Sequence, residues 1–220
     1  MATVDVIAEP WRLWFPNAST SLVTSNLGST VVSAGTPAAD PRADSYYDSY
    51  TTGSNAGNGA IVSTAGQLAY TDFDWTWEIV IYTGAALTGL RYFFGVGVAA
   101  PSNSDGVTSR KLLFRYSTVA GDTSWTPTSA DNTSQNVGTA MGSIATDTRY
   151  VLTIRFVSSG TPTAYFSING GTEQAVTANL PGTGFNLNGQ MACFNTAGGA
   201  GSARSFSFGR GQLHYGASAR

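Results

Sequence analysis

Residues 73 to 82 read FDWTWEIVIY. Large apolar side chains take every second position of this stretch, and Asp74, Thr76 and Glu78 lie between the first of them. An alternation of period two is typical of a β-strand with one face in a protein core. The stretch therefore predicts a strand from Phe73 onward, with its aromatic and isoleucine side chains, Trp75 and Trp77 included, on the buried face.

The same alternation recurs in four later stretches, at residues 90–98, 111–116, 150–156 and 164–168. Each is rich in aromatic and β-branched residues, which favour strands, and no window of a dozen residues shows a helical period. The triplet Asn169-Gly170-Gly171 predicts a tight hairpin, because Asn and Gly accept positive φ angles. Short strands joined by turns predict an all-β sandwich or barrel.

The N-terminal residues lack this pattern. Residues 1 to 19 hold Trp11, Trp14 and Phe15 between Pro10 and Pro16, and they predict an extended arm. One domain is expected to follow at residues 20 to 220. The aromatic residues of the arm are candidates for attachment or subunit contacts, since large aromatic side chains make good interface anchors. Trp11 and Trp14 are interpreted either as such an anchor or as the start of an edge strand.

Residues 34 to 59 are rich in Gly, Ala, Ser, Asp and Tyr, and they predict a long surface loop. A loop of this length is unusual in a compact domain, so we expect it to be functional or packed on a neighbour. Its tyrosines, Tyr46 and Tyr47, are candidates for stacking against sugar rings, as is Trp125 further along the chain.

The composition disfavours some partners. Charged residues make up 11% of the chain and the net charge is −2, whereas a nucleic-acid-binding surface needs many cations against phosphates. Lys111 is the single lysine, and the arginines form no cluster in the sequence. No stretch is apolar enough to span a membrane. Residues 1 to 10 lack the basic start of a signal peptide, which predicts a protein made in the cytoplasm and not exported by general secretion.

Metal and nucleophilic chemistry have few candidate residues. The chain has one cysteine, Cys193, interpreted as a buried strand residue, and one histidine, His214, interpreted as a strand or tail residue. Together they are too few for a zinc site, and we expect no metal and no cofactor. Asp105 with Asn103, and Asp72 with Asp74, could offer oxygen ligands to calcium. Our preferred interpretation of these acids is that they are solvated turn residues.

A catalytic set is also missing from the sequence. Glycoside hydrolases use two carboxyl groups about 5 to 9 Å apart, and Glu78 with Glu173 is the pair that could serve. Two solvated strand residues are the simpler interpretation of these glutamates. No Gly-x-Ser-x-Gly motif accompanies His214. The expectation is therefore that the protein is not an enzyme.

Two groups of motifs carry a family resemblance. Residues 149–154 read RYVLTI, residues 164–170 read AYFSING, and residues 179–181 read NLP. This order resembles the concanavalin A-like or laminin-G-like domains, which implies an antiparallel jelly-roll β-sandwich. Residues 90–95, LRYFFG, and 114–125, FRYSTVAGDTSW, extend the likeness. With them, residues 60 to 190 resemble a group of bacteriophage virion proteins that carry a concanavalin-like domain.

The resemblance implies a component of a phage particle. The leading hypothesis is a capsid decoration protein at the head surface that binds the major capsid lattice, forms a homo-oligomer with a trimer favoured, and is localised to the virion. The first alternative is a tail-associated lectin that binds host polysaccharide. The second is a polysaccharide-degrading glycoside hydrolase. Jelly rolls support all three roles, so the fold does not choose among them.

Overall fold

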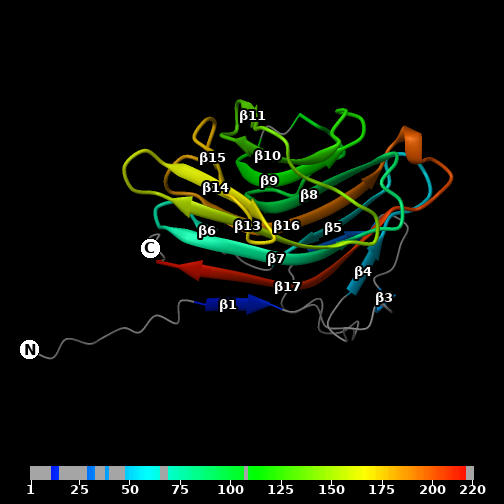
Figure 1. Cartoon of the computed structure of the whole chain (residues 1–220), viewed down its shortest axis with the longest axis horizontal. Helices are drawn as coiled ribbons and strands as arrows, with labels where there is room; N and C mark the ends of the chain where they lie inside the picture. Colours follow the sequence, from blue (N-terminus) through cyan, green and yellow to red (C-terminus); the bar gives the residue numbers. More distant parts are fainter. Residues whose placement is uncertain are drawn as a thin grey trace, which may run out of the picture.

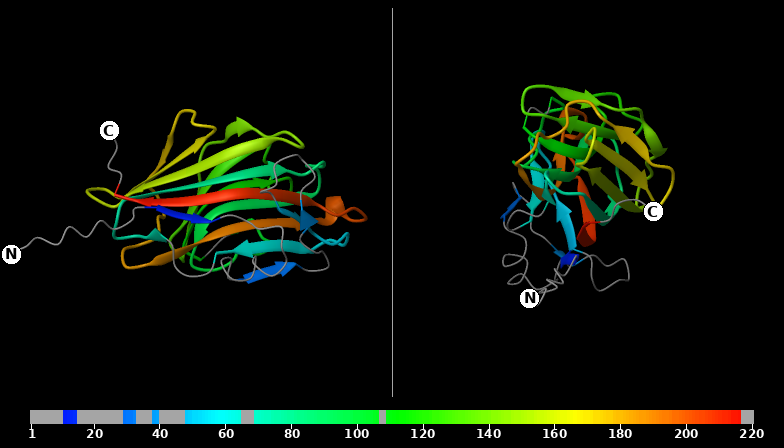
Figure 2. Two further views of the ribbon diagram at one scale, coloured as in Figure 1. Left: turned by 90° about the horizontal axis from the view of Figure 1, so that it is seen from below. Right: turned by 90° about the vertical axis from the view of Figure 1, so that its left-hand side faces the viewer.

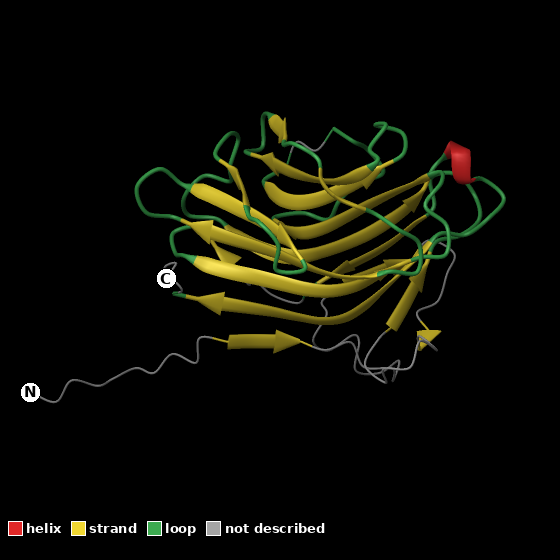
Figure 3. Ribbon diagram, viewed as in Figure 1, coloured by secondary structure: helices red, strands yellow, loops and turns green. Residues whose placement is uncertain are grey.

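The computed structural model describes residues 11–14, 29–32, 38–39, 48–64, 69–106 and 109–216. Strands make up most of this part of the chain, and one short 3₁₀ helix lies at Ala197–Gly199 (Figure 3). The described residues contain no helix that is long and apolar enough to cross a membrane.

The strands form two sheets. Sheet A contains, in spatial order, β15 (Gln174–Val176), β14 (Thr163–Ile168), β13 (Arg149–Val157), β7 (Trp75–Thr83), β17 (Ser205–Tyr215), β4 (Asp48–Thr51) and β3 (Ala38–Ala39), and β1 (Trp11–Trp14) also pairs with β17. The left-hand view of Figure 2 shows β1 alongside β17.

Sheet B contains β11 (Gln135–Val137), β10 (Ser124–Ala130), β9 (Lys111–Ser117), β8 (Leu90–Gly97), β16 (Asn186–Asn195), β5 (Gly59–Ser63) and β2 (Ser29–Val32) in spatial order. Beside this path, β12 (Met141–Ser143) pairs with β10, and β6 (Ala69–Tyr70) pairs with β16. All of these pairings are antiparallel, and Figure 1 shows how the two sheets are arranged. The predicted all-β antiparallel sandwich is confirmed.

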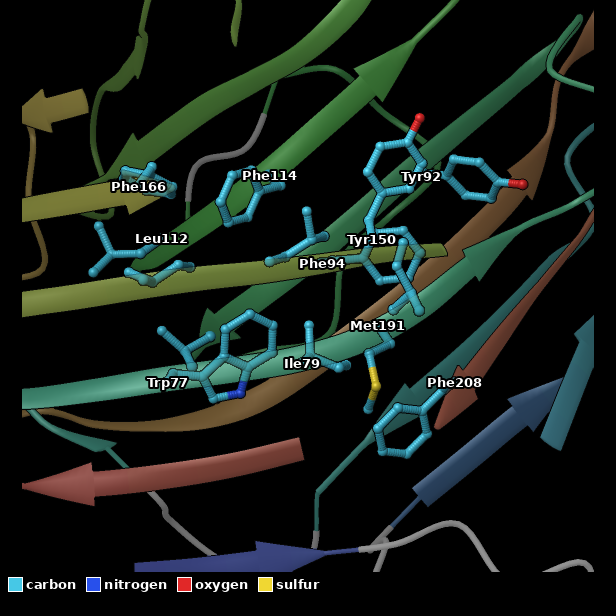
Figure 4. Close-up of a cluster of buried hydrophobic side chains, with 14 of the residues drawn as sticks. Trp77, Ile79, Tyr92, Phe94, Leu112, Phe114, Tyr150, Phe166, Met191 and Phe208 are labelled. Carbon is cyan, nitrogen blue, oxygen red and sulfur yellow. The ribbon is translucent and has the colours of Figure 1, made fainter. Parts of the chain in front are cut away.

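The core lies between the two sheets, where the alternating side chains of both meet (Figure 4). Trp77 and Ile79 of β7 and Phe94 of β8 are fully buried there, as the period-two pattern predicted. Phe114 of β9 packs edge-on against Phe166 of β14, with ring centroids 5.1 Å apart. Each sheet thus contributes aromatic side chains to one continuous core, which is what the sequence pattern of both sheets requires.

The first residue of the 73–82 alternation departs from the prediction. Strand β7 begins at Trp75, and Phe73 lies in the preceding turn with 59% of its surface exposed. The amide of Phe73 donates to the carbonyl of Tyr70 at 3.2 Å, which closes the turn. Because the chain turns before Trp75, the alternation does not carry Phe73 into the core.

Two predictions about the N-terminal part are revised. Residues 11–14 form strand β1, which pairs with Gly211 to His214 of β17. Of the two interpretations of Trp11 and Trp14, the backbone pairing supports the strand. Inside the loop predicted at residues 34 to 59, β3 and β4 join sheet A and β5 begins at Gly59. The sequence pattern missed β4 because Tyr50 is its one large apolar residue; Tyr50 is buried and stacks on Phe206 at 5.3 Å.

The predicted hairpin after β14 is confirmed. Asn169 and Gly170 have φ angles of 52° and 68°, and the amide of Gly171 donates to the carbonyl of Ile168 at 2.9 Å. Two successive positive φ angles match the type I′ turn that suits the twist of paired strands. The chain then returns as β15 against β14.

Candidate functional site

Each glutamate of the pair considered from the sequence is engaged by a polar partner in sheet A. Glu78 of β7 accepts a hydrogen bond from Gln212 Nε2 of β17 at 2.8 Å. Glu173 forms an ion pair with Arg155 of β13, on the opposite side of β7. The two glutamates are therefore held by partners on opposite sides of β7.

The outer face of sheet B is unlike an ordinary solvated sheet face, because its side chains are largely buried. The alternation that sends Phe94 and Phe114 into the core turns their strand neighbours to the other side. There, Phe93 and Leu113 anchor a second apolar cluster with Ala130, Ala192 and Phe194. We call this surface the outer face; its residues include Arg91, Phe93, Gly97, Lys111, Leu113, Arg115, Thr128, Asn188, Gln190, Ala192 and Phe194.

A buried ion pair lies on the outer face, close to the turn between β9 and β10. Arg115 of β9 makes two hydrogen bonds of 2.9 Å to the carboxylate of Asp122, and the side chains are 7% and 9% exposed. The same carboxylate accepts the amide of Ser117 at 2.9 Å. Asp122 therefore both neutralises a buried guanidinium and fixes the turn between β9 and β10.

A segment of chain folds back over this face. The connection that follows β8, residues 98–106, reaches Arg91 at the far end of that strand; we call it the strap. Arg91 donates to both carboxylate oxygens of Asp105, at 3.0 and 2.9 Å, and to Asn103 Oδ1 at 2.5 Å. Burial acts to raise the pKa of Asp105, but hydrogen bonds from Arg91 and Ser117 outweigh it and lower that pKa.

The structure shows what the acidic residues considered as calcium ligands contact. Asp105 and Asn103 are not free turn residues, as our preferred interpretation had them, because they hold Arg91. Asp74 accepts two hydrogen bonds from Ser158, and Asp72 accepts the amide of Gly184. Within the described residues, no group of three or more His, Cys, Asp or Glu side chains is placed to hold a metal ion.

Lys111 is the one cation of the outer face without a carboxylate partner among the described residues. It is 4% exposed, and its Nζ donates to the strap carbonyl of Ala100 at a long 3.3 Å. Its side chain lies over Gly97, where a Cβ atom would approach Lys111 Cγ to 2.7 Å. Burial lowers the pKa of Lys111 to about 8. An ammonium group has three donors, so this buried cation is only partly satisfied.

Lys111→Met is expected to raise the free energy of unfolding at pH 7 by about 1–3 kcal/mol. At pH 7 the lysine is charged in both states, and only the folded state bears the cost of burying the charge. Between pH 8 and 10.5 the unfolded chain still binds the proton that the folded chain has released, so wild-type stability rises with pH. Urea unfolding at pH 7 and pH 11 should show the advantage of Lys111→Met shrinking at the higher pH. A variant that is less stable than wild type at pH 7 would contradict this.

The predicted sugar-stacking role of Trp125 is wrong. Trp125 is fully buried in the core, 5.6 Å from the ring of Tyr150 and 5.9 Å from that of Phe94. It presents no ring face to solvent, so it cannot stack on a sugar. The other stacking candidates, Tyr46 and Tyr47, lie outside the described residues.

The attachment candidates of the arm remain predictions. Trp11 and Trp14 belong to β1, whose backbone pairs with β17. Phe15 lies outside the described residues. Cys193, by contrast, is fully buried as predicted, and burial raises the pKa of its thiol, which keeps the sulfur protonated. His214 lies in β17, and partial burial lowers its pKa.

Solved structures of other proteins share this architecture. No family model matches the sequence, and no curated protein matches it. Among solved structures, the carbohydrate recognition domain of Emp46p in its potassium-bound form is similar over 96% of this chain and 90% of its own, with a TM-score of 0.61 and 9% identity. The fold is that of the concanavalin A-like lectins. At 9% identity, this similarity shows the fold alone.

Two lyases share the same fold. The endo-β-1,4-glucuronan lyase of Trichoderma reesei is similar over 92% of this chain and 94% of its own, at a TM-score of 0.61 and 8% identity. The alginate lyase Aly36B, as a mutant in complex with alginate trisaccharide, covers 93% of this chain and 95% of its own, at a TM-score of 0.58 and 13% identity.

The expectation that the protein is not an enzyme is therefore wrong. It rested on missing motifs of hydrolases and serine enzymes, whereas this concanavalin A-like sandwich also carries lyases, which those motifs do not describe. The sequence pattern also did not predict that the outer face of sheet B is a candidate binding site. Its residues, such as Lys111 and Asn188, come from separate strands and form no local motif.

Proposed function

We propose that this protein binds polysaccharide through the outer face of sheet B. The observation that carries the proposal is a buried, partly unsatisfied set of polar groups on that face. The ammonium of Lys111 has one long hydrogen bond, and the buried Oδ1 of Asn188 has no hydrogen-bond partner among the described residues. Buried polar groups are normally satisfied, so exceptions call for an explanation; hydroxyl-rich ligands would satisfy both.

Two further observations support a carbohydrate ligand. Structures with this fold include a carbohydrate recognition domain and lyases of glucuronan and alginate. Exposed apolar side chains also lie on strands and connections of sheet B: Val98 follows β8, Val119 lies between β9 and β10, and Val137 ends β11. Apolar contact combined with a few placed polar groups is the usual composition of a small-molecule site.

The location of binding can be tested by nuclear magnetic resonance. Oligosaccharides of neutral and acidic polysaccharides are titrated into the labelled protein. We expect the amide signals of Gly95 and Gly97 in β8 and of β16 to shift, while those of β13 and β14 stay in place. Shifts confined to sheet A, or no shift with any oligosaccharide, would refute the proposal. Ultraviolet absorbance of the same mixtures shows whether an unsaturated product of cleavage accumulates.

A matched pair of charge substitutions tests the same assignment. Val137→Asp adds a carboxylate at an exposed position of edge strand β11, next to Thr128 of the outer face. It is expected to weaken binding of an acidic oligosaccharide about fivefold, by repulsion worth about 1 kcal/mol. Ala175→Asp adds the same charge to an exposed position of edge strand β15 in sheet A and should leave the affinity unchanged. Titration calorimetry measures both, and equal effects would contradict the assignment.

We propose a phage particle as the setting of this binding. The support is the resemblance of residues 60 to 190 to virion proteins, and the roles of head decoration and of tail receptor binding both stay predictions, as does the trimer. Purified protein mixed with particles that lack it should restore density on the head lattice or at the tail in electron micrographs. Deleting residues 1 to 19 should abolish that density if the arm attaches the protein. Unchanged density would sink the role of the arm.

A further inference from the structure

The row of side chains that runs across Gly97 contains complementary groups that do not satisfy each other. Gly97 of β8 lies between Asn188 of β16 and Lys111 of β9 in the strand register. Because Gly97 has no side chain, the stem of Lys111 occupies the space above it. The row therefore combines a buried ammonium that can donate further hydrogen bonds with a buried Oδ1 of Asn188 that accepts none from the residues that the structure describes.

The charges around Lys111 leave it as the uncompensated cation. Arg115 on the same strand is neutralised by Asp122, and Arg91 on β8 by Asp105 of the strap. The residues opposite Lys111 on β8 and β10 are Gly97 and Ala130, which carry no charge. Among the described residues of the outer face, Lys111 is therefore the cation that no carboxylate neutralises.

The side chain beside this row is already engaged. Gln190 accepts a hydrogen bond from Ser63 at 2.7 Å through Oε1, and its Nε2 reaches the carbonyl of Gly97 at 3.4 Å. Gln190 therefore cannot turn its amide to Asn188 or Lys111 without losing these bonds. Within the described part of the chain, no carboxylate pairs with Lys111 and no donor reaches Asn188 Oδ1, so both groups are open to an external partner.

We infer that Lys111 and Asn188 form a subsite for an acidic sugar residue, whose carboxylate binds the Lys111 ammonium and whose hydroxyl donates to Asn188 Oδ1. A sugar acid carries both groups on one ring, whereas a simple carboxylate such as acetate lacks the hydroxyl donor and a neutral sugar lacks the charge. This inference rests on the proposed polysaccharide binding at the outer face and names the class of ligand. An acidic sugar is favoured because its carboxylate would replace the long hydrogen bond from Lys111 to the Ala100 carbonyl. A hydrogen bond between an ammonium and a carboxylate is stronger than one to a neutral carbonyl.

Entry to the subsite passes the beginning of the strap. Val98, Ala99 and Ala100 are exposed, and the strap touches Lys111 there through one long hydrogen bond. The strap is attached at both ends: the amide of Val98 donates to the carbonyl of Arg110 at 3.1 Å, and Arg91 holds Asp105 and Asn103 at the other end of β8. Ala99 and Ala100, between these attachments, can therefore yield to a ligand while both ends of the strap stay attached.

The test compares acidic oligosaccharides of glucuronan and alginate with their carboxyl-reduced counterparts, which differ only in that each carboxylate is a hydroxymethyl group. Wild type is expected to bind at least one acidic form about 10- to 100-fold more tightly than its reduced form. Lys111→Met should lose this preference, because it weakens binding of the acidic form far more than binding of the reduced form. Asn188→Leu should weaken both forms, by about two- to tenfold. Arg149→Met, which removes an exposed cation from sheet A, should change neither.

A pH series adds a second readout. Because the pKa of Lys111 is about 8, the preference of wild type for the acidic form should fall as the pH rises past that value, and Lys111→Met should show no such fall. Equal affinity of wild type for acidic and reduced forms, or a full preference in Lys111→Met, overturns the subsite. If both forms still shift the signals of sheet B, the polysaccharide proposal stands while the subsite fails. If neither form binds, both fail.

Discussion

Asp122→Ala is expected to lower the free energy of unfolding by about 3–5 kcal/mol. The substitution leaves the guanidinium of Arg115, which is 7% exposed, without its carboxylate, and it leaves the amide of Ser117 without an acceptor. A buried charge that loses its partner cannot recover its hydration, so the cost exceeds the value of the pair itself. Guanidinium or urea unfolding, followed by tryptophan fluorescence, measures the difference.

Two controls show whether the stranded charge causes the loss. The double variant Arg115→Met with Asp122→Ala removes both charges and should recover most of the stability. Glu173→Ala breaks the more exposed ion pair with Arg155, where Glu173 is 40% exposed, and should cost less than about 1 kcal/mol. A double variant as unstable as Asp122→Ala alone would show that the turn, and not the buried charge, needs Asp122.

Trp125→Ala is expected to lower the free energy of unfolding by about 3–5 kcal/mol. The indole packs among the rings of Tyr92, Phe94, Tyr116 and Tyr150, with centroid distances from 5.6 to 6.4 Å. Removing it opens a cavity in the layer between the two sheets, and the surrounding aromatic rings can collapse only in part. Thermal and chemical unfolding both report this loss.

The same position separates a core role from a ligand-stacking role. Trp125→Phe should cost clearly less than Trp125→Ala, because the buried indole Nε1 has no hydrogen-bond partner among the described residues to lose and the ring refills most of the space. Under conditions where each variant is folded, oligosaccharide affinity should equal that of wild type. Lost affinity in a stable Trp125→Phe variant would restore the stacking role that the structure removes.

The motif FRYSTVAGDTSW, which extended the family resemblance, has a structural explanation. Phe114 and Trp125 enter the core from adjacent strands, while Arg115 and Asp122 form the buried ion pair of the outer face. Gly121 takes a φ of +79°, a conformation that side chains rarely adopt, at the turn between them. The motif therefore describes a hairpin, and the polar groups assigned to ligand binding, Lys111 and Asn188, lie outside it.

The sequence by itself determined the strands and their buried faces. A period of two is a local property, so β7, β8, β9, β13 and β14 and their inward side chains could be read without knowing any pairing. The hairpin at Asn169-Gly170 was equally readable, because a turn of positive φ depends on neighbouring residues. Trp125 escaped the same analysis, since its neighbours Ser124 and Thr126 gave no apolar alternation to follow.

Only the tertiary structure decided which outward-facing side chains are buried and which meet. Alternation separates Lys111 and Leu113 from the core side of their strand, but it does not say that the strap and the sheet enclose them. Gly97, Lys111 and Asn188 lie far apart in the chain and become neighbours through the pairing of β8 with β9 and β16. Register between distant strands depends on the packing of the whole sandwich. A lysine and an amide oxygen that are not fully satisfied by the described residues therefore become neighbours through the fold and not through any single segment.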